Sequence, residues 1–168
     1  MSSNHSISAG RSWPTKANKP DMAVVPGRGP VDAVETKWRQ LPLTWQWIRA
    51  RHGITSPGSA FPGILPLVAA AGAQPRLRQL YPFTSHFTLA FSSCTRYPYL
   101  VEAPVVEPLH DGRFRVHSPR GGAVIGETET AEEAVALVMT HLPDGLGPAV
   151  AGTADALDRQ PAAPPASP

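Results

Sequence analysis

The chain has a single cysteine, Cys94, among its 168 residues. One thiol cannot form an intramolecular disulfide, nor can it supply a multi-cysteine zinc site. Chains without disulfides are typical of reducing compartments, so the sequence predicts a cytoplasmic protein. Long apolar runs are also missing. No stretch approaches the roughly 20 residues of a membrane-spanning helix, and residues 1–20 lack the apolar core of a signal peptide. We therefore expect no membrane partner.

Recognisable catalytic and cofactor motifs are missing too. The glycine-containing segments 27–30 and 120–122 have neither the strand-to-helix context nor the lysine of a phosphate-binding loop. The histidines do not fall at zinc-ligand spacing with carboxylates. The sequence therefore predicts no metal and no cofactor.

Charged side chains make up only 17% of the chain, and they are unevenly distributed. Up to Arg78 there are ten Lys or Arg and three acids, whereas the remainder has five and ten, so +7 and −5 give the net charge of +2. A basic half favours nucleic acid when its charges cluster on one face. Here they are dispersed and the acidic half compensates for them, so we expect no nucleic-acid partner.

Proline and glycine are abundant instead, with 20 and 14 residues, and they are frequent near both ends. Segments rich in Pro, Gly, Ser and Ala bury too little apolar surface to offset the entropy lost on ordering. We predict a disordered N-terminal arm (1–30), a single domain (31–157) and a disordered C-terminal tail (158–168). The oligomeric state is not predicted.

Apolar residues at alternating spacings of three and four predict helices. Such a stripe runs from Val31 to Ile48, with Asp32 and Glu35 as a candidate capping box and Pro42 as a kink or a break between two helices. A short apolar helix is expected over 65–73. A third helix is expected over 130–142, where Thr130 and Glu133 form a capping box.

Alternating patterns predict strands over 87–92, 113–118 and 123–126. Pro104 and Pro108 restrict any strand in 100–109 to a sheet edge or a short piece. Together these patterns predict a two-layer α+β domain, in which amphipathic helices cover an antiparallel β-meander of three to four strands. The predicted core consists of Trp38, Leu41, Trp45, Leu77, Leu80, Phe87, Leu89, Phe91, Phe114, Val116, Val135 and Val138.

Polar residues gather where the helical turn 74–80 meets the first strand. We predict that ligand-binding residues lie there, with Arg76 and Arg78 gripping an anionic group because guanidinium matches carboxylate and phosphate. Tyr81, Ser85 and His86 would shape the same site.

Two functional interpretations remain open. The first is a non-catalytic binding or accessory module, favoured because no paired carboxylates, metal cluster or cofactor loop is evident. The alternative is a small enzyme that uses His86 as a general base, with Ser85 or Cys94 as its nucleophile. Catalytic residues are therefore not assigned.

The runs LRQLYPFTSH (77–86) and LPDGLGPAVAGT (142–153) carry a resemblance to a known family. The segment 75–157 resembles DUF6193, an actinobacterial family catalogued as a domain of unknown function and labelled a natural product biosynthesis protein. The resemblance implies a role near secondary metabolism, with a biosynthetic intermediate or a partner biosynthetic enzyme as the ligand. With the two arginines, the expected partner is a small anionic metabolite or such an enzyme. The resemblance carries over no functional residue.

Overall fold

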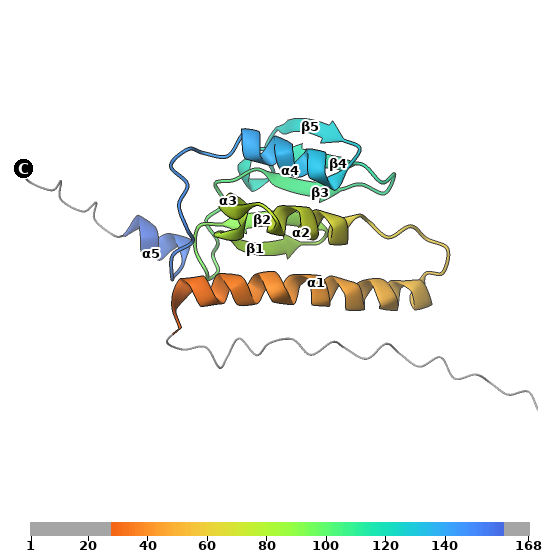
Figure 1. The fold of residues 1–168 in the computed structure, drawn as a ribbon, viewed down its shortest axis with the longest axis horizontal. Helices are drawn as coiled ribbons and strands as arrows, with labels where there is room; N and C mark the ends of the chain where they lie inside the picture. Colours follow the sequence, from red (N-terminus) through yellow and green to blue (C-terminus); the bar gives the residue numbers. More distant parts are fainter. Residues whose placement is uncertain (1–27, 160–168) are drawn as a thin grey trace, which may run out of the picture.

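The computed structural model describes residues 28–159. The predicted arm 1–30 and tail 158–168 lie outside these residues except at their inner ends. Figure 1 shows helices packed on one face of a sheet. In chain order the elements are α1 (Gly29–Thr55), α2 (Ile64–Gly72), α3 (Pro75–Arg78), β1 (Tyr81–Ser85), β2 (Thr88–Ser92), β3 (Val105–Pro108), β4 (Phe114–His117), a 3₁₀ turn (Pro119–Gly121), β5 (Val124–Thr128), α4 (Ala131–Thr140) and α5 (Ala154–Asp158).

The sheet is an antiparallel meander in the order β1–β2–β3–β4–β5. The predicted α+β class with an antiparallel sheet is confirmed, but the sheet has five strands where three to four were expected. The additional strand is β1, which was not among the predicted strands and contains Pro82. β1 is an edge strand, and proline is tolerated at an edge because its missing N–H can face away from the ladder.

The proline-flanked strand β3 is short, as expected, and lies in the middle of the sheet. It pairs with β4 from Val105 to Pro108, whereas its register with β2 is confined to Leu89 opposite Val106. Pro104 precedes this strand and is buried. The two halves of the sheet are therefore joined by fewer main-chain pairs than the hairpins on either side.

Helix α1 is a single helix that runs through Pro42, not a pair of helices. It begins at Gly29, ahead of the predicted start, and Asp32 does not cap it. Pro30 explains the earlier start, because proline fixes a helical φ in the first turn, where its missing N–H costs nothing. Burial of Trp38, Leu41 and Trp45 on one side offsets the hydrogen bond lost at Pro42.

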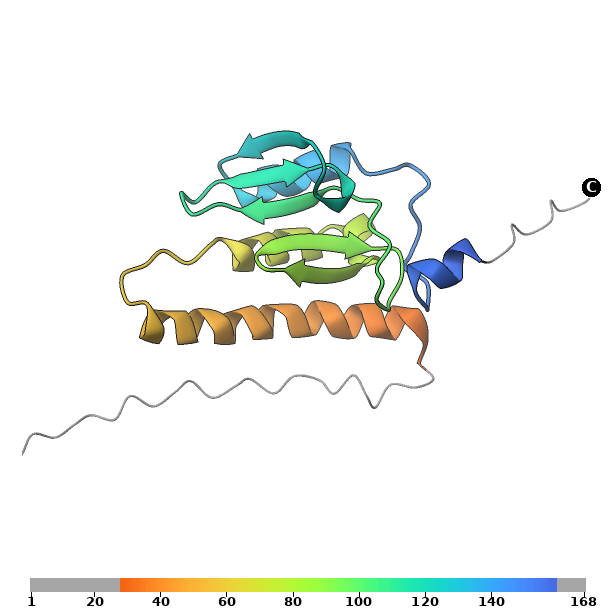
Figure 2. The ribbon, with the colours of Figure 1, turned by 180° about the vertical axis from the view of Figure 1, so that it is seen from behind.

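The core lies between the sheet and helices α1, α2 and α4. Figure 2 shows the opposite face of the sheet, which no described helix covers. At the centre Phe91 packs on Trp38, with ring centroids 6.3 Å apart. Of the predicted core residues, eleven are buried and Phe87 is partly buried against them.

Candidate functional site

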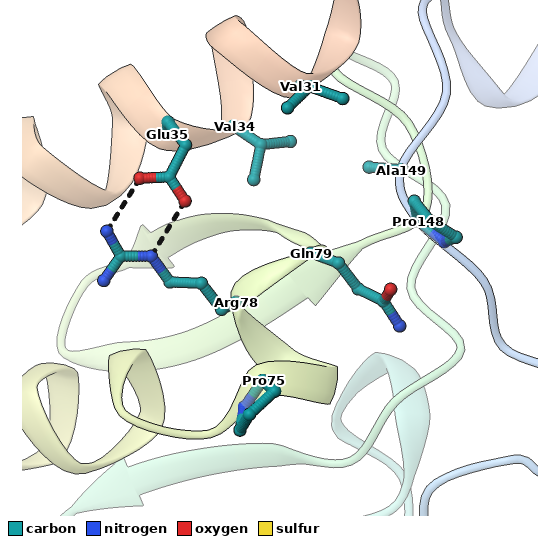
Figure 3. Close-up of a pocket in the computed structure, with 8 residues that line it drawn as sticks. All are labelled: Val31, Val34, Glu35, Pro75, Arg78, Gln79, Pro148 and Ala149. Atoms are coloured by element: carbon teal, nitrogen blue, oxygen red, sulfur yellow. Dashed lines mark hydrogen bonds and ion pairs between the residues drawn. The ribbon is translucent and has the colours of Figure 1, made fainter.

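A cavity of about 360 Å³ opens where the N-terminal part of α1 meets α3 and the segment 143–149 (Figure 3). Most of its wall is apolar. The polar groups of the wall come from a glutamate, an arginine and a glutamine. The lining residues are Val31, Val34, Glu35, Pro75, Arg78, Gln79, Pro148 and Ala149.

Side-chain hydrogen bonds hold α3 against α1. Arg78 donates to both carboxylate oxygens of Glu35, through Nε to Oε1 at 3.0 Å and through Nη2 to Oε2 at 2.7 Å. Trp38 Nε1 donates to the carbonyl of Leu80 at 3.0 Å. Because the Arg78–Glu35 bonds join two walls of the cavity, they set its width.

The third wall is the loop that leads from α4 toward α5. Arg76 Nη2 donates to the Pro143 carbonyl at 3.0 Å, and the Ala149 amide donates to the Gln79 carbonyl at 3.0 Å. Beyond the cavity, the Val150 amide donates to Ser93 O at 2.9 Å. The runs 77–86 and 142–153, which carried the resemblance, therefore contact each other directly.

The opposite charges of Glu35 and Arg78 cancel each other. The hydrogen bond from Arg78 lowers the pKa of Glu35, and the same bond raises the pKa of Arg78, so both groups are ionised at neutral pH. Arg78 Nη1 also donates to the Gly72 carbonyl at 3.3 Å, and its guanidinium lies 5.9 Å from the centre of the Trp38 ring. The cavity therefore has a neutral ion pair at its edge instead of a free cation.

The residues predicted to bind ligand are divided between two places. Arg78 lines the cavity and Arg76 supports its wall through Pro143. Tyr81 is buried at the start of β1, where burial raises its pKa to about 12. Ser85 and His86 are exposed at the far end of that strand, about 13 Å from Tyr81 at the rise of an extended chain. The structure does not bring them to the arginines.

Of the two nucleophiles in the enzyme alternative, Cys94 is separated from His86, whereas Ser85 directly precedes it in the chain. His86 is in the β1–β2 turn, whereas Cys94 lies past the opposite end of β2 and is fully buried. The Cys94 sulfur accepts a hydrogen bond from the Leu100 amide at 3.3 Å. These contacts give Cys94 a packing role within the loop that follows β2.

Sequence reasoning missed the apolar part of the site. Val31 and Val34 were assigned to a helix stripe, and Glu35 to a cap, because a single sequence does not show which distant residue each one meets. The distinctive run 142–153 was the available signal for Pro148 and Ala149.

One comparison with known proteins found a match. The family model of a family of unknown function (DUF6193) matches residues 32–153. The chain belongs to this family. The DUF6193 match includes every lining residue of the cavity except Val31. Neither the curated proteins nor the solved structures contain a significant match to the chain.

Two absences apply to residues 28–159. No helix in this range is long and apolar enough to cross a membrane. The same residues contain no group of three or more His, Cys, Asp or Glu side chains that could hold a metal ion.

Proposed function

We propose that this DUF6193 protein is a non-catalytic binding module whose cavity between α1, α3 and the segment 143–149 takes a small, mainly apolar molecule. The observation that carries the proposal is the composition of the wall: mostly valine, proline and alanine side chains, with the Arg78–Glu35 pair at one side and the Gln79 amide apart from it (Figure 3). Small-molecule sites typically have this composition, in which the apolar surface supplies affinity and the polar groups fix orientation.

The polar end of the ligand would meet the Arg78–Glu35 pair. A neutral hydrogen-bonding group suits this arrangement, because Glu35 already neutralises Arg78. The anionic ligand expected from the arginines alone would have to compete with the Glu35 carboxylate for the guanidinium. We therefore favour a neutral polar end and treat the anionic metabolite as a distinct outcome of the test.

The resemblance noted above supports a role in natural product biosynthesis. In that setting the ligand would be a cytoplasmic biosynthetic intermediate, and the module would carry it or present it to a partner enzyme. An actinobacterial host is the natural source in which to look for the ligand.

The test compares small molecules retained by three forms of the chain from an extract of the native host. Val31 is 70% exposed at the rim of the cavity, so Val31→Trp should cover the opening without disturbing the core. Val124 is 56% exposed on β5, away from the cavity, so Val124→Trp is the matched control. We expect mass spectrometry to find a compound that the wild type and the control retain and Val31→Trp loses. Equal retention by all three forms would contradict the proposal.

A second variant separates the two ligand types. Glu35→Gln removes the carboxylate that competes for Arg78 but keeps the shape of the side chain. An anionic ligand should bind Glu35→Gln more tightly than the wild type, whereas a neutral ligand should bind both forms about equally.

A further inference from the structure

Strand β5 ends the sheet, and among residues 28–159 no strand pairs with its outer edge. The opposite edge strand, β1, lies against α1 (Figure 1). Along an antiparallel edge, every second residue directs its N–H and C=O away from the sheet. Such an edge readily accepts another strand unless charge, proline or a covering element protects it. β5 has the sequence Val-Ile-Gly-Glu-Thr, with Val124 56% exposed.

Helix α4 packs on the face of the sheet over β4 and β5, and together with the C-terminal end of β5 it forms a groove of about 510 Å³. Gly126 permits the close approach of the helix, because a Cβ at this position would lie 3.0 Å from Leu137 Cδ2. Residues 127–129 line the groove from the strand side, and Glu133, Ala136 and Leu137 line it from the helix side. An added strand would thus meet main-chain groups on one side and an apolar patch on the other.

The charge of the groove is negative. The Glu127 carboxylate is neutralised by Arg113 at 2.6 Å and by Arg115 at 2.8 Å. Glu129 and Glu133 also line the groove, and its lining includes no basic side chain. Glu133 already accepts hydrogen bonds from the amides of Glu129 and Thr130, which leaves its charge in place.

We propose that the β5–α4 groove binds a basic, extended peptide segment of a partner protein, which adds to β5 as a sixth strand. Main-chain hydrogen bonds would hold the segment, an apolar residue would lie on Leu137, and a lysine or arginine would meet Glu129 and Glu133. A second copy of this chain fits less well, because edge-to-edge pairing would bring the same glutamates of both copies together.

The test uses a fluorescent octapeptide of alternating valine and lysine, and the same peptide with glutamate in place of lysine. Fluorescence anisotropy with the full chain should show binding of the lysine peptide only. When this peptide is bound, the amides of β5 should exchange their hydrogens more slowly. Charge attraction without strand pairing would not protect these amides.

Two charge reversals make a matched pair. Glu129→Lys changes a residue of the groove, and Glu132→Lys changes another exposed glutamate, which lies on α4 outside it. We expect Glu129→Lys to weaken binding about threefold to tenfold, as loss and reversal of exposed ion pairs would, and Glu132→Lys to change it less than twofold. Equal weakening by both, protection outside β5, or a dimer formed through β5 without peptide would overturn the proposal.

Discussion

Arg78 and Glu35 lie 43 residues apart in the chain and form a bidentate ion pair that connects α3 to the first turns of α1. Each side chain is 41% exposed, so water screens the pair. Screened surface pairs typically contribute less than about 1 kcal/mol, and the pair therefore acts mainly on the position of α3. Its geometry matters for the cavity more than for the total stability.

Replacing Glu35 by Gln should lower the free energy of unfolding by less than about 1 kcal/mol at neutral pH. The folded-state pKa of Glu35 is lowered from 4.5, first by its hydrogen bond with Arg78, so folding favours the charged form. The stabilisation is present above pH 4.5 and is lost as the pH falls through the lowered pKa. Urea titrations across this range should show the wild-type and Glu35→Gln curves converging on the acid side. A difference that grows as the pH falls would contradict this sign.

Truncating Phe91 to Ala should destabilise the fold by about 3 to 5 kcal/mol, the usual cost of removing a buried phenylalanine. Phe91 is 1% exposed and its ring packs on Trp38. Tyr97→Ala is the control, because this aromatic side chain is 81% exposed. Thermal unfolding of both variants measures the contrast, and similar melting temperatures would place Phe91 outside the core.

Glycine in place of His86 should stabilise the β1–β2 hairpin by about 0.5 to 1 kcal/mol. His86 has φ of +56°, which is strained for a residue with a Cβ. His110→Gly provides the opposite expectation: His110 is also exposed in a turn but has no positive φ, so glycine should cost stability through unfolded-state entropy. Chemical denaturation of the two variants should give changes of opposite sign. Destabilisation by both would show that His86 makes contacts that outweigh its backbone strain.

Cys94 should not react with a water-soluble disulfide reagent in the folded protein, because its side chain is fully buried and hydrogen-bonded within its loop. In denaturant the same thiol should react fully and rapidly. The time course of thiol release measures both states. Rapid labelling under native conditions would support the interpretation of Cys94 as a nucleophile.

Much of the fold followed from local patterns. The Thr130–Glu133 capping box forms as predicted, with Glu133 N donating to Thr130 Oγ1 at 3.2 Å. Strand β1 was missed because Pro82 is a strong local signal against strands, and only the position of β1 at the sheet edge overrides it.

The candidate site was predictable only in part. Arg78 was predicted as a site residue because it lies beside a helix-to-strand junction, where polar residues gather. The role of Glu35 as its partner, and that of Ala149 as an opposite wall, depend on contacts between distant segments. No periodicity within a window of a few turns reports such contacts, so the sequence did not show that Arg78 is paired with Glu35.

Val31 and Ala149 face the same cavity although they lie near the two ends of the described domain. The first turn of α1 and the chain leading into α5 also lie on the same side of the molecule in both ribbon views. A protein tethered to either end would therefore be held near the mouth of the cavity. Its local concentration there would be set by the length of the tether. Exchange of a ligand with such a neighbour would then be an intramolecular event, and it would require no strong docking surface between the two bodies.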